Sequence, residues 1–180
     1  MNAKKFVEAL ASLAPRKEEL IAAGFSASLA ESYISSLNIQ NRESELGIET
    51  YEDELLALCN GWQVGSLEIG FFTLGKRPTD LDGKFVVGKL EQDEICFNRD
   101  SRCFFLLETY SNNEPRSCPV ANNGSDLLDV LQEYAAFIAK LATDEIEDDD
   151  DSQCLRLKEK FCCTLGGDEF LPFLGALLGC

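Results

Sequence analysis

The sequence predicts an α+β fold: a mixed, mainly antiparallel sheet of four to six strands with helices packed on it. Three apolar runs that suit β-strands follow one another closely, at residues 85–87, 95–97 and 103–107. Residues 126–141 then form one long amphipathic helical pattern. The run 103–107 is apolar on both faces, which favours a central strand. Apolar residues make up 45% of the 180 positions, so the chain can bury a sizeable core.

Short helices are predicted before the sheet, as an N-terminal extension over residues 1–43. Apolar side chains recur at helical spacing from residue 3 to residue 13. Residues 16–23 suit a second helix, which Gly24 is placed to end because glycine adopts the left-handed conformation of a helix terminus. Ser28 begins a Ser-x-x-Glu capping box for a third helix. We expect these helices to pack on the main domain.

The main domain is predicted over residues 44–142 and begins with a helix. Asp53 ends a Thr-x-x-Asp pattern that can cap this helix, and Asn60-Gly61 should stop it. Residues 67–74 then resemble a strand. Gly70 within it indicates a bulge or a close backbone approach.

Turn residues separate the remaining predicted elements. Residues 78–83 contain Pro, Asp and Gly, which are typical of a turn. Residues 99–102 suit the hairpin loop before the strand at 103–107. A longer polar loop runs from Ser111 to Ser125, and Ser125 can cap the long helix that follows.

The acidic run from Asp144 to Asp151 predicts a solvated linker over residues 143–152. Seven of its eight side chains are acidic, so they repel one another and oppose the dipole of the preceding helix. The run lacks the spaced ligands and central glycine of a calcium loop. Residues 153–180 should add a helix and an apolar tail, which must be buried on this domain or on another copy.

The chain is strongly acidic, with 32 acidic against 16 basic residues and a formal charge of −16. This charge repels phosphate, so nucleic-acid binding is not expected. It attracts basic proteins and speeds their encounter at low salt. The alternative interpretation is that the charge only keeps the protein soluble.

A cytoplasmic location is expected. No apolar run approaches the roughly 20 residues that cross a bilayer, so no membrane association is predicted. The N-terminal residues lack the uninterrupted apolar segment of a signal peptide. All eight cysteines are accordingly expected to be free thiols. Four have apolar neighbours and should be buried, namely Cys59, Cys96, Cys103 and Cys162.

No cofactor, metal or catalytic residue is expected. The cysteines lack the paired C-x₂₋₄-C spacing of a zinc site, and the chain contains no histidine. A cysteine nucleophile would lack histidine, its usual base. Acid–base catalysis would have to depend on carboxylates such as Asp80 and Asp82. A solvated surface explains those carboxylates equally well, so the sequence favours a protein that is not an enzyme.

The order of these elements resembles the SUKH superfamily over roughly residues 44–142. This superfamily groups fungal cell-wall regulators with bacterial immunity proteins that neutralise secreted toxins, many of them nucleases. The resemblance rests on Asn60-Gly61 after a helix and on Asp93-Glu94 before an aromatic-bearing strand, followed by a hairpin and a closing helix. The sequence departs from the pattern at Val86-Val87-Gly88, where a small-residue strand end is usual, and at Ser101, where glycine is frequent.

The resemblance implies a non-enzymatic binding protein of the immunity type, which neutralises a toxin, such as a basic nuclease, by occlusion. We expect acidic positions in the sheet region to bind this protein partner, namely Asp80, Asp82, Glu91, Asp93 and Glu94. A solvated surface is the alternative interpretation of each residue. The alternative function is a cytoplasmic regulatory or scaffolding adaptor, whose flanking helices recruit partners. The sequence predicts no particular oligomeric state.

Overall fold

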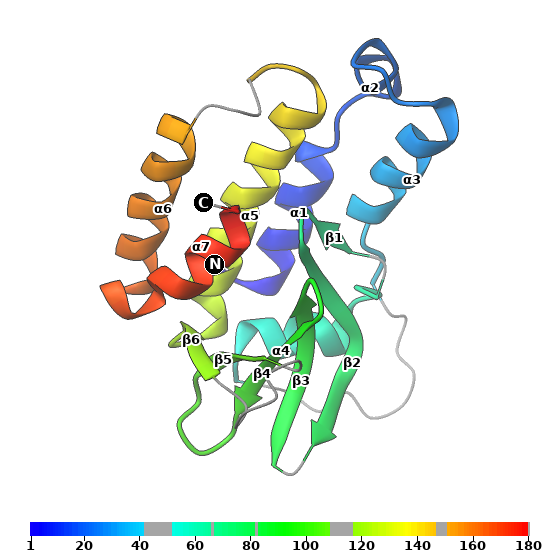
Figure 1. Cartoon of the computed structure of the whole chain (residues 1–180). Helices are drawn as coiled ribbons and strands as arrows, with labels where there is room; N and C mark the ends of the chain where they lie inside the picture. Colours follow the sequence, from blue (N-terminus) through cyan, green and yellow to red (C-terminus); the bar gives the residue numbers. More distant parts are fainter. Residues whose placement is uncertain (42–51, 66, 82, 109–116, 147–150, 180) are drawn as a thin grey trace.

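The computed structural model describes residues 1–41, 52–65, 67–81, 83–108, 117–146 and 151–179. Within these residues it forms an α+β fold with seven α-helices, one short 3-10 helix and a six-stranded antiparallel sheet (Figure 1). The predicted fold class is therefore confirmed. Every strand pairing is antiparallel, so the sheet holds no parallel pair among the described strands.

The strands are paired in the order of the sequence, which makes the sheet a simple meander. Their bounds are β1 Glu68–Ile69, β2 Phe72–Leu81, β3 Lys84–Leu90, β4 Asp93–Asn98, β5 Phe104–Leu107 and β6 Ser117–Ala121. Since strands that follow one another directly also pair, the connections are local, as is usual for antiparallel sheets.

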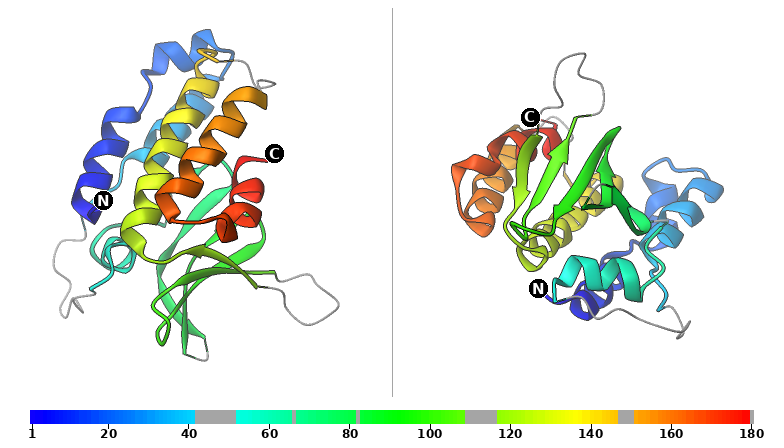
Figure 2. Two further views of the ribbon diagram at one scale, coloured as in Figure 1. Left: turned by 90° about the vertical axis from the view of Figure 1, so that its left-hand side faces the viewer. Right: turned by 90° about the horizontal axis from the view of Figure 1, so that it is seen from below.

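The helices gather on one side of the sheet (Figures 1 and 2). Their bounds are α1 Ala3–Leu13, α2 Lys17–Ala22, α3 Ala27–Leu37, α4 Glu54–Gly61, α5 Gly124–Ala142, α6 Asp151–Leu165 and α7 Leu171–Leu178, with the 3-10 helix η1 at Asp168–Phe170. Helix α5 is central, because α1, α4 and α6 pack against it. Helices α4 and α5 also contact the sheet directly.

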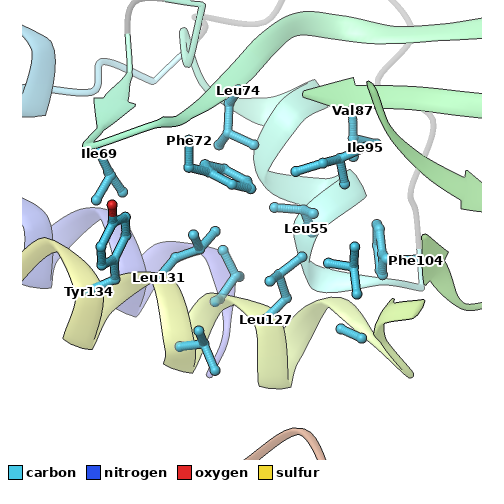
Figure 3. Packing of buried hydrophobic residues seen from close by; sticks show 14 of the residues in the cluster. Leu55, Ile69, Phe72, Leu74, Val87, Ile95, Phe104, Leu127, Leu131 and Tyr134 are labelled. Carbon is cyan, nitrogen blue, oxygen red and sulfur yellow. The ribbon is translucent and has the colours of Figure 1, made fainter. Parts of the chain in front are cut away.

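One hydrophobic core lies between the sheet and the helices (Figure 3). Phe72 and Ile95 point into it from the strands, Leu127 and Leu131 from α5, and Leu55 from α4; all five are fully buried. Leu127 and Leu131 are four residues apart and share one helix face, whereas the strand residues alternate in and out. The apolar residues at helical spacing and the apolar residues that alternate along the strands therefore pack together in this core.

The predicted strand at 67–74 is wrong as a single element. The chain turns back at Gly70-Phe71, so that Ile69 pairs with Phe72 and the segment forms the β1–β2 hairpin. Gly70 has φ +55°, a conformation that favours glycine. The close approach predicted at this glycine does occur, but with the Tyr134 side chain of α5 and not with another backbone.

The predicted turn at 78–83 is shorter than expected, because β2 extends to Leu81 and β3 begins at Lys84. Strand β2 continues well beyond the two-residue β1, so Pro78 lies where β2 forms the edge of the sheet. An edge position tolerates a residue without a backbone N–H. The hairpin loop predicted at 99–102 is confirmed between β4 and β5, where the Arg102 N–H donates to the Asn98 carbonyl at 2.8 Å.

Two predicted helix caps are wrong by two residues. Asn123, not Ser125, caps α5, and its side chain accepts a hydrogen bond from the Asp126 N–H at 2.9 Å. Ser125 instead binds the Met1 ammonium group, which also pairs with Asp129 at 2.8 Å. The N-terminus is thereby held against the first turns of α5.

Helix α3 likewise begins earlier than predicted. Ser26, not Ser28, caps it and accepts from the Leu29 N–H at 3.3 Å. Gly24 has φ +95° and ends α2 as predicted. This sharp reversal lets the chain enter α3 within two residues, which moves the cap towards the N-terminus.

The C-terminal apolar segment is buried within this chain. Phe173, Leu174 and Leu177 of α7 are fully buried and belong to the common core. Helix α7 packs against α6 and against the edge strand β6. Of the acidic run, residues 147–150 lie outside the described residues.

The cysteines differ from the prediction of eight free thiols. Cys154 carries a disulfide bond whose other half lies outside the described residues. Six of the described cysteines form no disulfide, and Cys59, Cys96 and Cys162 among them are buried as predicted. Cys103 is only half-buried, because it follows the exposed β4–β5 loop. A disulfide is typical of oxidising compartments, so the cysteines no longer support the cytoplasmic prediction.

Thiol counting tests this disulfide directly. Protein purified without reductant and denatured should react as six thiols, the number of free cysteines described, and as eight after reduction, the number in the sequence. The measurement is a colorimetric thiol titration, with cysteine-modified peptides mapped by mass spectrometry. Eight reactive thiols before reduction would show that Cys154 is not disulfide-bonded in the isolated protein.

Candidate binding face of the sheet

The face of the sheet that points away from the helices is the candidate binding surface, here called the outer face. Seen from below, the strands pass in front of α5 (Figure 2, right). Successive register pairs place one row of side chains across all six strands, namely Glu68, Thr73, Lys89, Glu94, Leu107 and Ser117. None of the six is buried. The neighbouring inner positions Phe72, Leu74 and Ile95 are buried, as alternation along a strand requires.

A second row on the outer face is apolar. Val86 pairs with Cys96, which pairs with Phe105 on the next strand. Val86 and Phe105 are half-buried, and Cys96 between them is fully buried. The Lys84 Nζ lies 5.2 Å from the centre of the Phe105 ring, where a cation is attracted by the aromatic face.

Cys96 is not suited to act as a nucleophile. Burial, with a smaller contribution from the nearby Glu94 carboxylate, raises the pKa of its thiol to about 11, and Lys84 opposes the shift. The thiol therefore stays protonated near neutral pH, whereas the thiolate is the reactive form. Cys96 acts as a small apolar group within the second row.

The structure places Asp80 away from Glu91, Asp93 and Glu94. It lies beside the β2–β3 turn, where its carboxylate accepts from the Gly83 N–H at 3.1 Å and pairs with Arg99 at 2.9 Å. The Arg99 guanidinium also stacks over the Phe85 ring at 4.0 Å. Asp80 thus belongs to a local network that neutralises its charge. Asp82 lies outside the described residues.

Glu91, Asp93 and Glu94 come together at the opposite end of β3. This strand has seven residues, so about 20 Å separates these three carboxylates from Asp80. Glu91 lies in the two-residue β3–β4 turn with φ +53°, and Asp93 and Glu94 open β4.

Two further carboxylates and one aromatic ring extend this end of the sheet. Glu68 is in the same cross-strand row as Glu94, and Glu108 directly follows the Leu107 that pairs with Glu94. We call these residues the acidic end: Glu68, Glu91, Asp93, Glu94 and Glu108. Phe71 lies beside them, because its carbonyl accepts from the Glu91 N–H at 2.9 Å, and its side chain is 51% exposed.

Sequence reasoning missed Phe71 and Glu68. The apolar pattern at 67–74 predicts one continuous strand, in which Phe71 is an ordinary strand residue. Gly70 was the available signal, because a glycine followed by an aromatic residue in a short strand also fits a tight hairpin. That hairpin exposes Phe71 at its tip.

The described residues contain no fully buried polar or charged side chain and no cluster of three metal-ligating side chains. Among these same residues, the carboxylates with a resolved pKa shift are Glu19 and Glu31. Both pKa values are lowered by hydrogen bonds from a basic side chain, Arg16 and Lys17 respectively, and both groups are on the surface. In the described part of the chain, no helix has the length and apolar character that a membrane crossing requires.

Comparison with known proteins returns no match among protein-family models, curated proteins or solved structures. The resemblance to the SUKH superfamily therefore stays a prediction that rests on the residues quoted for it.

Proposed function

We propose that this chain is a non-enzymatic binding protein that neutralises a basic protein, such as a toxin, by covering its surface. The observation that carries the proposal is the acidic end of the sheet, where Glu68 and Glu94 lie on the outer face, with the exposed Phe71 beside it. Aromatic anchors surrounded by polar residues are typical of protein interfaces. A rigid six-stranded sheet supports this arrangement, so little conformational freedom is lost on binding.

Electrostatics supports a basic partner. The chain carries a formal charge of −16, and Glu68, Glu91 and Glu94 make no ion pair within the described residues. Such charges attract a basic protein over distances up to the screening length, which is about 8 Å at physiological ionic strength. They act mainly on the association rate, whereas the contacts of Phe71 act mainly on dissociation.

Two substitutions separate these roles. Affinity capture from the native host supplies the candidate partner, and surface plasmon resonance over a salt series measures both rates. Glu91→Lys should slow association several-fold at low salt and less at high salt. Phe71→Ala should raise the dissociation rate by about ten-fold or more, since a central aromatic anchor contributes 2 kcal/mol or more to binding.

Matched controls lie on α6, away from the sheet. Glu159→Lys makes the same change in net charge, and Leu155→Ala removes a side chain that is 55% exposed. Both should bind at nearly the wild-type rates. Equal effects of the sheet variants and the α6 variants would place the interface elsewhere. An acidic partner, or a basic one that stays toxic in cells expressing this chain, would contradict the proposed function.

A further inference from the structure

A second surface feature lies in the helical layer, between α5 and α6. These helices lie side by side and run in opposite directions (Figures 1 and 2). Between them lies an open hollow of about 540 Å³, here called the α5–α6 groove. This volume is within the range of small-molecule sites, which is about 300–1,000 Å³.

The groove has an apolar floor. Phe137 of α5 and Leu157 of α6 line it, and both are half-buried side chains that also pack against the core. Its lining residues span positions 133–140 on one helix and 153–160 on the other. Seven residue steps correspond to about 10 Å along a helix, which sets the length of the groove.

The charges at the two ends of the groove differ. At one end Glu133 and Lys160 close the groove with an ion pair of 2.8 Å. Towards the other end Lys140 and Arg156 line the hollow, and neither makes an ion pair or hydrogen bond with another side chain among the described residues. Two basic side chains that make no ion pair in the described part of the chain are unusual where acidic residues outnumber basic ones two to one. The groove thus combines apolar side chains with two basic side chains towards one end.

We propose that the α5–α6 groove binds a small amphipathic carboxylate, whose anionic head contacts Lys140 and Arg156 and whose apolar body covers Phe137 and Leu157. The guanidinium of Arg156 can bind a carboxylate through two hydrogen bonds, and Lys140 adds a second charge. A length of about 10 Å suits an alkyl chain of roughly eight to ten carbons, but only two turns of a partner helix. The site is separate from the outer face and does not depend on the function proposed for it.

Decanoate, kept below its micelle-forming concentration, is the probe for this site. Titration into isotope-labelled protein should shift backbone amide resonances of α5 and α6 and leave those of the outer face unchanged. The Lys140→Gln/Arg156→Gln double variant should weaken binding by about ten-fold or more, since one charge-assisted hydrogen bond contributes at least that factor. Decylammonium, with the same apolar chain and the opposite charge, should not bind.

The matched control is Lys4→Gln/Lys5→Gln, which removes two exposed cations from α1. It should bind decanoate as the wild type does, and thermal melts should show that both double variants are folded. The proposal is overturned if decanoate causes no shifts in α5 and α6. It is equally overturned if the shifts centre on the separate hollow beside Phe25 and Tyr33, or if decylammonium binds equally well.

Discussion

Replacing Asp53 with alanine should lower the free energy of unfolding by about 3 kcal/mol, from the loss of a helix cap and of a charge-assisted hydrogen bond between helices. The Asp53 Oδ1 accepts from the N–H groups of Leu55 and Leu56 at 2.9 and 3.2 Å, which caps α4. Its Oδ2 accepts from the Gly124 N–H at 2.7 Å, in the first turn of α5. One carboxylate therefore joins the N-termini of two helices, where the helix dipoles also favour a negative charge. Urea denaturation measures the loss.

Asp53→Asn separates the two contributions. The asparagine oxygen can still cap α4, because asparagine is a good N-cap residue, but its NH₂ group cannot accept from the Gly124 N–H. We expect this variant to lose about half as much stability as Asp53→Ala, on the same estimates. Equal losses in the two variants would show that the cap contributes nothing beyond the link to α5. A loss below 1 kcal/mol in Asp53→Ala would show that solvent replaces the carboxylate without cost.

The sheet could be predicted because its signals are local. The apolar runs that form β4 and β5 are separated by a short loop of five residues, so their pairing and direction follow from the short connection. The helix caps could not be predicted as accurately as the sheet, since Asn123 and Ser125 are both good cap residues and are only two positions apart. The choice between them depends on where β6 ends and on the Met1 ammonium group that occupies Ser125.

The candidate site could be predicted only in part, because its geometry depends on strand direction. Asp80 and Glu91 are eleven positions apart in the sequence, and both are acidic residues next to turns. Antiparallel pairing places the β2–β3 turn and the β3–β4 turn at opposite ends of β3, which separates them. The α5–α6 groove could not be predicted from the sequence, for another reason. No local sequence pattern predicts that Lys140 and Arg156 line the same hollow, because this depends on how α5 and α6 pack against each other.

Gly70→Ala should destabilise the protein by about 3 kcal/mol, the sum of a backbone cost at positive φ and of overpacking in the core. Gly70 has φ +55°, and a Cβ atom there would lie 2.2 Å from the Tyr134 hydroxyl oxygen and 2.8 Å from its Cζ. Tyr134 is 2% exposed, so its ring cannot move aside without disturbing the core around Ile69 (Figure 3). Its hydroxyl also hydrogen-bonds with the Phe71 backbone, which holds the β1–β2 turn on α5. Thermal and urea denaturation measure the effect.

Two further variants separate the causes. Gly24→Ala is the matched control, because Gly24 has φ +95° and no atom within 4 Å of the added Cβ, so only the backbone cost of about 1–2 kcal/mol remains. Tyr134→Phe removes the atom nearest to the new methyl group. The double variant Gly70→Ala/Tyr134→Phe should therefore be more stable than the sum of the single losses predicts, by about 1 kcal/mol, as expected for residues in direct contact. Strict additivity would show that the strain of Gly70→Ala is confined to the backbone, and the β1–β2 turn would then not depend on its approach to Tyr134.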